Sequence, residues 1–585
     1  MKKITLLLFV FLLILALAAC GGESETTLTN NTSTTTKVSN HTTEKPATTI
    51  KKPIITHETD ATSNQPSNPS IPTVTTTSQS VTTEPELPAS VGLEFQFLDS
   101  IGGYSFSGLG SCTDSDIVVP SSVNGRPVLY TGEFGDGFSG VNNRDKITSI
   151  VIPGSVIAIP RETFSDCPNL KSVTILGSNV LIQYGAFSNC PSLAEINLPN
   201  GYVQIEANAF ANTAYYNNAN NWEDGILYIG NHLIEAKKDI TSCTVKDSTL
   251  SIANKAFENC ESLKTITLPN HAIHIGKDTF ENTAYYNDIN NWEEGNLLYD
   301  ESIGGVLYIG SHLIAVNDPK TSLVMKDGTL SIASAALEDY EHNTIKLANT
   351  LECISAYAFE DAHITSIKIP GSVKYVGEYA FSDCDYLSNV TIEHGVQHID
   401  SSAFSSCTAL TTITLPGSIK IVADNTFSHC SKLSHVILEE GITAISTNTF
   451  FGCKALSYLS LPESLTTIGY GAFRKCTSLK TVTIPKNMTT IGYGAFFECD
   501  SLTNITIPST VTTIKEAAFY NCESLTTLVI PQSVTTVEKQ IVSNCRVFCE
   551  AKSQPNGWDE AWLGEDTTVY FGNFWHYVDG VPTVK

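Results

Sequence analysis

The segment 462–484 reads PESLTTIGYGAFRKCTSLKTVTI, and the next segment, 485–507, repeats its pattern as PKNMTTIGYGAFFECDSLTNITI. Both follow the template P-x-x-[VIL]-x-x-[IV]-x-x-x-A-F-x-x-C-x-x-L-x-x-[VIL]-x-[IL], which recurs every 23 residues from Val373 to Cys545. A fixed period of about 20–50 residues indicates stacked supersecondary units and not one globular core. We therefore expect a solenoid in which each 23-residue unit is one rung.

Two positions of the template keep the phase of the repeat. The Phe recurs at Phe381, Phe404, Phe427, Phe450, Phe473, Phe496 and Phe519, and the Cys at Cys167, Cys190, Cys260, Cys384, Cys407, Cys430, Cys453, Cys476, Cys499, Cys522 and Cys545. Equivalent side chains lie over one another in a stack, so we expect the phenylalanines to form an interior spine. The cysteines are expected to be buried structural thiols, because side chains of a parallel ladder do not point at each other.

Each rung contains two extended pieces and one turn. In the first piece, Val482 and Ile484 alternate with threonines, which predicts a strand with one buried and one outward face. Pro485 ends this strand because it has no N–H to give to the next rung. A second extended piece follows at 488–491, and the Ala-Phe pair then begins a short α or 3-10 turn. The predicted fold is a right-handed curved solenoid, mainly β, with the short turns on its convex side.

Residues 1–19 have the pattern of a targeting signal. Two lysines precede a continuous apolar run from Ile4 to Ala19, which is shorter than a bilayer-spanning helix requires. The run ends in LAAC at Cys20, which resembles the lipobox of bacterial lipoproteins. That resemblance implies cleavage before Cys20 and a lipid on its sulfur, which would hold the chain on the extracellular face of the bacterial cell membrane. Ordinary secretion, with cleavage after an A-x-A motif, is the alternative.

Residues 20–90 are predicted to be a disordered stalk. They are dominated by Thr and Ser with scattered Pro, and 21–90 contain no Phe, Tyr or Trp. Such a segment cannot bury enough apolar surface to offset its ordering entropy. It would serve as a tether that lifts the folded part away from a membrane.

Folding is expected to begin near residue 91. Short alternating runs at 93–97, 104–108 and 116–120 predict strands of an N-terminal cap over 91–146. The solenoid is predicted over 147–545. The aromatic, irregular segment 546–585 is predicted to close its C-terminal end, since the ends of a solenoid need atypical units.

Two related cassettes interrupt the solenoid, at 212–240 and 282–320. Each contains Thr-Ala-Tyr-Tyr-Asn, then Asn-Trp-Glu, then Leu-Tyr-Ile-Gly. Alternating apolar runs on both sides of Gly230-Asn231 predict a β-hairpin. The aromatics of the two cassettes are candidate anchors for a sugar or protein partner, and packing of the cassette on the stack is the simpler interpretation. These aromatics are Tyr215, Tyr216, Trp222, Tyr285, Tyr286 and Trp292.

The template closely resembles the BspA-type leucine-rich repeat of bacterial surface proteins. The cassette motifs resemble elements of the same family, as does the ending from Cys549-Glu550-Ala551 to Gly557-Trp558-Asp559. The resemblance spans roughly residues 93–560. It implies a leucine-rich-repeat solenoid with a parallel sheet on the concave face, and a role in adhesion at the cell surface. One departure is that the Cys precedes the Leu strand, so the familiar Asn ladder at the strand's end is absent.

Composition and motifs exclude several functions. The formal charge of −26, with only 34 Lys and Arg, argues against a nucleic-acid partner. The sequence has no nucleophile elbow, zinc-protease motif, phosphate-binding loop or Cys pair with zinc-ligand spacing. His271 and His274 are interpreted as exposed loop histidines. We therefore predict no enzymatic activity, no cofactor and no metal.

The best candidate for recognition is the outward face of the first strand of each rung, expected on the concave side. Its polar and aromatic positions are Asn389, Thr391, Thr412, Thr414, His435, Tyr458, Ser460, Thr481, Thr483, Asn504, Thr506 and Thr527, and Ile437 and Val529 are its apolar ones. Thr and Ser can form hydrogen bonds, although Thr is also simply a good strand former.

Three functions follow from this reading. The first is a lipid-anchored, monomeric surface protein that binds a protein or glycoprotein on host cells, matrix or neighbouring cells. The second is a structural spacer of the cell envelope without a dedicated ligand. The third, an enzyme within the C-terminal aromatic segment, is the least supported.

Overall fold

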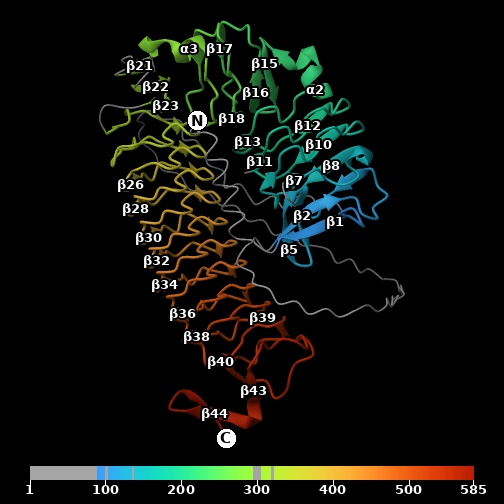
Figure 1. The fold of residues 1–585 in the computed structure, drawn as a ribbon, viewed down its shortest axis with the longest axis vertical. Helices are drawn as coiled ribbons and strands as arrows, with labels where there is room; N and C mark the ends of the chain where they lie inside the picture. The colour runs from blue at the N-terminus through green and yellow to red at the C-terminus, as the bar shows by residue number, and fades with distance from the viewer. Residues whose placement is uncertain (1–87, 99–102, 135–137, 179, 294–304, 318–321) are drawn as a thin grey trace, which may run out of the picture. The chain divides into compact units, whose positions relative to one another are not determined.

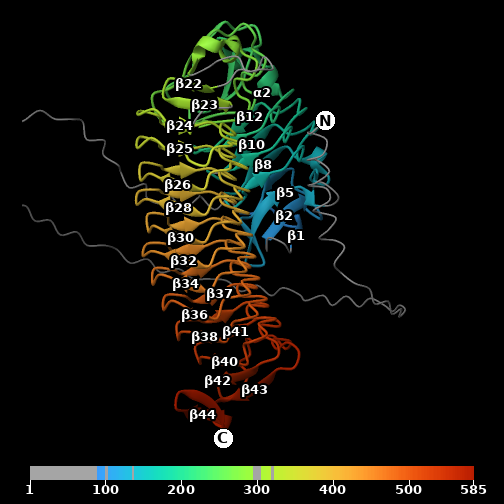
Figure 2. The ribbon, with the colours of Figure 1, turned by 60° about the vertical axis from the view of Figure 1, so that its left-hand side comes forward.

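The computed structural model describes residues 88–98, 103–134, 138–178, 180–293, 305–317 and 322–585. Over these residues the chain forms a β-solenoid whose rungs follow one another in chain order (Figure 1), and Figure 2 shows the same stack from a second direction. The predicted solenoid fold is confirmed. The predicted signal peptide, Cys20 and nearly all of the predicted stalk lie outside the described residues.

The first strand of each rung is three or four residues long, and we call it the long strand. The long strands are β3 (Asp116–Val118), β8 (Ser149–Ile152), β10 (Ser172–Ile175), β12 (Glu195–Asn197), β17 (Ser242–Thr244), β19 (Thr265–Thr267), β26 (Ser366–Ile369), β28 (Asn389–Ile392), β30 (Thr412–Leu415), β32 (His435–Leu438), β34 (Tyr458–Ser460), β36 (Thr481–Thr483), β38 (Asn504–Thr506) and β40 (Thr527–Ile530). Each pairs in parallel and in register with its neighbour, as Val436 with Leu459 and Val482 with Ile505.

The second strand of each rung is two residues long, and we call it the short strand. The short strands are β9 (Ala158–Ile159), β11 (Leu181–Ile182), β13 (Gln204–Ile205), β18 (Ser251–Ile252), β20 (His274–Ile275), β24 (Ser331–Ile332), β25 (Cys353–Ile354), β27 (Tyr375–Val376), β29 (His398–Ile399), β31 (Ile421–Val422), β33 (Ala444–Ile445), β35 (Thr467–Ile468), β37 (Thr490–Ile491), β39 (Thr513–Ile514) and β41 (Thr536–Val537). They also pair in parallel, as Ile445 with Ile468. Each rung therefore contributes to two sheets on different sides of the core.

The Ala-Phe turn forms the third side of a rung. Backbone N–H groups donate to carbonyls three residues back, as Ala495 to Gly492 and Cys499 to Phe496, so the predicted helical turn is a series of tight hydrogen-bonded turns. The phenylalanines stack as the predicted spine. Ring centroids of successive rungs lie 4.7–5.8 Å apart and the rings are nearly parallel, as for Phe359 with Phe381 and Phe496 with Phe519.

The cysteines of the repeat lie beside this spine as free, buried thiols. The Sγ of Cys430 donates to the carbonyl oxygen of Phe404, in the preceding rung, at 3.2 Å. The same bond is made at 3.0–3.3 Å by Cys190, Cys384, Cys407, Cys453, Cys476, Cys499 and Cys522. The thiol thus gives a hydrogen bond to a carbonyl group in the interior. This is a structural role, as predicted.

The cassettes are part of the stack. The first contains α2 (Ala214–Asn217), η2 (Ala219–Asn221), β14 (Trp222–Glu223), β15 (Ile226–Ile229) and β16 (His232–Ala236), and the second contains α3 (Ala284–Asn287), η3 (Ile289–Asn291), β21 (Trp292–Glu293), β22 (Gly305–Ile309) and β23 (His312–Asn317). The predicted hairpin is confirmed, because β15 and β16 pair antiparallel around Gly230, whose φ is 57°. Strand β16 also pairs in parallel with β18, and β23 with β24. The second hairpin strand therefore takes the place of a short strand.

The N-terminal region adds further strands. They are β1 (Glu94–Leu98), β2 (Gly103–Gly108), β4 (Ser122–Val123), β5 (Arg126–Thr131), β6 (Glu133–Phe134) and β7 (Phe138–Ser139), with the 3-10 turn η1 (Arg144–Lys146). Strands β1, β2 and β3 confirm the three predicted strands. Strand β5 pairs with β2 on one side and, through Tyr130 and Ala158, with β9 on the other, which joins this region to the short-strand sheet.

At the C-terminus, two more parallel strands, β42 (Arg546–Cys549) and β43 (Thr568–Phe571), continue the sheet of β40. They are followed by η4 (Gly572–Phe574) and the hairpin β44 (Trp575–Val578) and β45 (Val581–Val584). Trp558 and Trp575 are buried, and their indole N–H groups donate to the carbonyls of Val534 and Cys549. The predicted irregular end therefore begins with regular strands. These strands could not be predicted from the repeat, because the 23-residue spacing ends at Cys545.

Contacts between early and late rungs show which sheet faces inward. The ring of Tyr202, just before β13, lies 4.9 Å from the ring of Tyr375 in β27. The short strands of early and late rungs thus face one another, and the long strands lie on another side of each rung. The prediction that the long strands form the concave face is wrong. A single rung contains two strands of similar pattern, so its sequence alone does not determine which of the two strands lies on the concave side.

Candidate functional site

The predicted outward positions of the long strands form one aligned face, which we call the candidate face. Across β28, β30, β32 and β34 the register aligns Asn389, Thr412, His435 and Tyr458 in one row. Of the twelve predicted residues, ten are exposed, while Ser460 and Thr527 are partly buried. Besides the four residues of this row, the exposed positions are Thr391, Thr414, Thr481, Thr483, Asn504 and Thr506. These positions are exposed because successive residues of a strand point to opposite sides, and the alternate residues Val390, Ile413 and Val482 point into the core.

The exposed part of the candidate face between β28 and β38 is polar except for one patch, which comprises His435, Ile437 and Tyr458. Tyr458 keeps 50% of its surface exposed and Ile437 keeps 39%. The rings of His435 and Tyr458 stack across the strand pair with centroids 5.7 Å apart. Exposed aromatic and aliphatic side chains of this kind are the usual anchors of protein interfaces, whereas threonines form the surrounding rim.

The cassette aromatics mainly contact one another and the hairpins. In the first cassette the Trp222 indole N–H donates to the Tyr216 carbonyl at 2.7 Å, and the Tyr215 hydroxyl donates to the Tyr228 carbonyl at 2.8 Å. The second cassette repeats both bonds, from Trp292 to Tyr286 at 2.7 Å and from Tyr285 to Tyr308 at 3.2 Å. The edge-to-face contacts of Tyr216 with Trp222 and of Tyr286 with Trp292 are also the same, with centroids 5.2 Å apart. These contacts favour packing over partner binding for all six residues.

The sequence did not reveal the polar row on the short strands. The first residues of consecutive short strands align as His312, Ser331, Cys353, Tyr375 and His398. In the preceding rungs, His232, Ser251 and His274 align in the same way. A signal was present, since each of these residues directly precedes the apolar residue at the [IV] position of the template, which is Leu in the two hairpin strands, but this stretch was interpreted only as an extended piece.

The interpretation of His274 as an exposed loop residue is wrong. His274 is buried in β20, and neither ring nitrogen has a hydrogen-bond partner within the described part of the chain. Burial lowers the pKa of His274 to about 4, so the ring is neutral at physiological pH. His271 is a turn residue, and its Nε2 is 2.6 Å from the Asp247 carbonyl oxygen. A neutral buried ring beside a hydrogen-bonded one does not form a metal or catalytic pair.

Several carboxyl groups lie where early and late short strands face one another. Glu206 follows β13, Glu378 and Asp400 follow β27 and β29, and Asp424 follows β31. Burial raises the pKa of Glu378 to about 8 and that of Asp424 to about 6. Burial also acts on Asp400, but hydrogen bonds and the charge of His398 lower the pKa of Asp400 overall. Glu378, Asp400 and Asp424 come from three consecutive rungs, whereas Glu206 comes from an early rung and is brought near Glu378 only by the curvature, so sequence reasoning missed the group.

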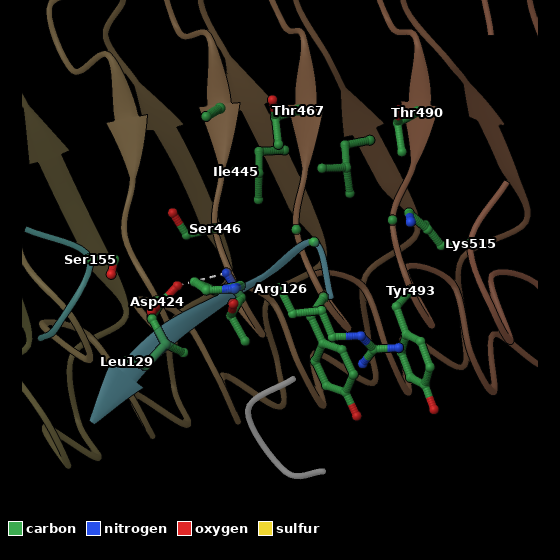
Figure 3. A pocket seen from close by; sticks show the side chains of 18 residues that line it. Arg126, Leu129, Ser155, Asp424, Ile445, Ser446, Thr467, Thr490, Tyr493 and Lys515 are labelled. Carbon is green, nitrogen blue, oxygen red and sulfur yellow. Dashed lines mark hydrogen bonds between the residues drawn. The ribbon is translucent and has the colours of Figure 1, made fainter. Parts of the chain in front are cut away.

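A cavity of about 460 Å³, lined by Asp424 of this group, lies where the start of β5 meets β33, β35 and β37 (Figure 3). Arg126 and Leu129 line it from the N-terminal side, and Thr467, Thr490 and Tyr493 line it from the later rungs. No residue of the cavity was a predicted site residue. The sequence separation of more than 300 residues between its two walls explains why.

Two other features concern chemistry and membranes. Among the described residues, no group of three or more His, Cys, Asp or Glu side chains is placed to hold a metal ion. No helix in the same part of the chain has both the length and the apolar character needed to cross a bilayer.

Several solved structures are similar to this chain. A leucine-rich repeat protein from Bacteroides ovatus is 22% identical over 82% of this chain and 98% of its own, with a TM-score of 0.33. A leucine rich cell surface protein from Faecalibacterium prausnitzii is 20% identical over 74% of this chain and 92% of its own, with a TM-score of 0.28. The pneumococcal vaccine antigen PcpA is 12% identical over 83% of this chain and 98% of its own, with a TM-score of 0.23. No curated protein matches the chain.

The sequence also matches the model of one protein family, described as the BspA type leucine rich repeat region, in six copies. The matches cover residues 141–238, 227–294, 309–434 and 420–548, which together are more than half of the chain. These ranges include all the long strands from β8 to β40 and the Phe spine from Phe164 to Phe519. The chain therefore belongs to the BspA-type leucine-rich repeat family.

Proposed function

We propose that this chain is a cell-surface adhesion protein that binds a protein or glycoprotein partner through the candidate face. The observation that carries the proposal is the exposed patch of His435, Ile437 and Tyr458 within a rigid, otherwise polar sheet. Membership of a leucine-rich-repeat family supports protein binding as the general role. The partner would lie on host cells, matrix or neighbouring cells, and the chain would act as a monomer.

The patch has the composition of a binding hot spot. Tyrosine is enriched among such residues, and its ring loses little conformational freedom on binding because it has only two rotatable bonds. The stacking of His435 on Tyr458 restricts both rings before a partner arrives. The threonines of β30 and β36 on either side can then exclude water and form hydrogen bonds at the rim.

Replacement of Tyr458 by Ala is expected to weaken binding about 30-fold or more, since a hot-spot side chain contributes at least about 2 kcal/mol. The experiment is a screen of the full chain against matrix proteins, mucins and glycans, followed by affinity measurement of the variant by surface plasmon resonance. Tyr184, which is 37% exposed and lies after β11, provides the matched control as Tyr184→Ala. If both variants bind as the wild type does, the candidate face is not the site. If no partner is found, the envelope-spacer function is favoured.

We further propose that a lipid on Cys20 and the stalk 20–90 hold the solenoid away from the membrane. The LAAC motif supports the anchor, and two acyl chains suffice for stable attachment, where one chain would be marginal. A flexible stalk of this length has a root-mean-square span of roughly 45–50 Å.

The variant Cys20→Ser is expected to move the protein from the membrane fraction to the medium, because the thioether to the lipid cannot form. The distribution is measured by fractionating cells that express the protein and by metabolic labelling with a fatty acid. Cys112→Ser, at a partly exposed thiol within the folded part, is the control and should stay lipidated. A Cys20→Ser protein that remains membrane-bound would contradict the anchor.

A further inference from the structure

The cavity described above has the size of a small-molecule site, since such sites range over about 300–1,000 Å³. Its floor is made by β33, β35 and β37, whose parallel pairing holds their side chains at fixed spacing. Its opposite wall is Gly125 and the start of β5 (Figure 3). Because neither wall alone encloses the space, the site exists only when the early and late rungs are in contact.

Arg126 is the most unusual residue of the cavity. Its guanidinium lies 4.6 Å from the Phe97 ring centroid and 4.2 Å from that of Tyr493, which fixes its position by cation–π contact. Its Nη1 is buried and has no hydrogen-bond partner among the described residues. No carboxylate in that part of the chain forms an ion pair with it, although the formal charge of the protein is −26. A buried donor on a charged group is costly without an acceptor, so Arg126 is suited to bind an anionic ligand.

The other charged groups near the cavity already have partners. The Lys515 ammonium donates to Glu538 at 2.6 Å, and Asp424 accepts a hydrogen bond from the Thr447 backbone N–H at 2.7 Å. Among the described residues, Arg126 therefore has no ion-pair partner, and Asp424 adds one negative group elsewhere in the lining. A single carboxylate fits this balance better than a doubly charged phosphate group does.

Hydroxyl groups surround the rest of the cavity. Thr467 and Thr490 lie on neighbouring short strands of the floor, and Ser446 lies just after β33. Figure 3 shows Thr467 and Thr490 on two neighbouring strands of the floor. Each hydroxyl can both donate and accept, which suits a ligand that itself carries several hydroxyl groups.

We propose that this cavity binds an acidic monosaccharide, with its carboxylate on Arg126 and its hydroxyl groups on Thr467 and Thr490. The site is separate from the candidate face, so the chain would recognise an acidic sugar with its short-strand side and a protein with its long-strand side. A sugar bound here would also contact both early and late rungs, and would stabilise their contact.

The proposal is tested by isothermal titration calorimetry of the full chain with glucuronate, with glucose and with inorganic phosphate. We expect glucuronate to bind at least 10-fold more tightly than either of the other two compounds. Arg126→Gln should weaken glucuronate binding at least 10-fold, and Thr490→Val, which keeps the strand and removes one hydroxyl, should weaken it several-fold. Arg161→Gln is the matched control, since Arg161 also lies over a tyrosine ring, that of Tyr184 at 4.6 Å, away from the cavity.

The outcomes are distinguishable. Binding of glucose or phosphate as tight as that of glucuronate would overturn the proposal, as would an unchanged affinity in both Arg126→Gln and Thr490→Val. If Arg126→Gln alters the melting temperature, Thr490→Val decides the question, because Thr490 belongs to β37 on the floor and not to the wall that Arg126 forms. Absence of glucuronate binding to the wild type would also overturn it.

Discussion

Replacement of Phe473 by Ala is expected to lower the free energy of unfolding by about 3–5 kcal/mol, the usual cost for a fully buried Phe. The Phe473 ring has no exposed surface and stacks on Phe450 and Phe496, with centroids 5.4 Å away on both sides. Its removal leaves a void that two neighbouring rungs share. The backbone of each rung is held by pairing to the next, so the void cannot collapse without breaking that register.

The measurement is urea unfolding of the full chain followed by circular dichroism. Thr481→Ala is the control, because Thr481 is exposed on β36 and its truncation should be nearly neutral. Phe473→Leu should fall between the two, since Leu refills part of the void. Equal costs for Phe473→Ala and Thr481→Ala would contradict the assignment of the Phe to the interior.

The second large effect concerns pH and Glu378. Glu378 lies where the early and late short strands meet, near Asp400, Glu206, Tyr202 and Tyr375. Burial, followed by the charges of Asp400 and Glu206, raises its pKa from 4.5 to about 8. The folded chain therefore holds this proton more tightly than the unfolded chain does. The resulting stability is fully present below pH 4.5 and is lost as the pH rises through about 8.

Glu378→Gln is expected to remove most of this loss. A shift of this size corresponds to up to about 5 kcal/mol, and the partial exposure of the residue reduces the expected gain at pH 8.5 to about 2–3 kcal/mol. The melting temperature is measured at pH 5 and at pH 8.5 for both proteins. The variant should still lose a smaller amount of stability as the pH rises through about 6, because burial raises the pKa of Asp424 to about 6.

The matched control is Glu393→Gln. The Glu393 carboxylate is exposed, and a hydrogen bond from Lys368 lowers its pKa, so neutralising it should give no gain at pH 8.5. If the wild type is equally stable at pH 5 and pH 8.5, or if Glu378→Gln keeps the full decrease, the carboxyl groups do not govern the contact between the rungs.

Local features of this fold could be predicted because each rung repeats the same physical demands. The alternation around Val482 determined the long strand, and Gly230-Asn231 determined the hairpin. The interior position of Phe473 and of Cys430 followed from periodicity alone. These features depend on residues within one rung or on the next rung, and the sequence displays both.

Features that depend on curvature could not be predicted. The contact of Tyr202 with Tyr375, the raised pKa of Glu378 and the position of Arg126 against Tyr493 all require knowledge of which rungs face one another. Small rotations between rungs accumulate into this geometry, and no single repeat encodes the sum. For the same reason the candidate face could be identified as outward, but it was assigned to the wrong side of the curve.

In the run of rungs from Phe381 to Cys522, each Cys thiol donates to the Phe carbonyl of the preceding rung. This bond affects how the number of repeats can change in evolution. Every rung from Phe381 to Cys522 offers the same acceptor to its successor and the same donor to its predecessor. A recombination event that removes or adds one 23-residue unit therefore leaves every remaining junction unchanged. The number of rungs in this run, and with it the length of the candidate face, can therefore vary between descendants without changing the thiol bonds that join neighbouring rungs.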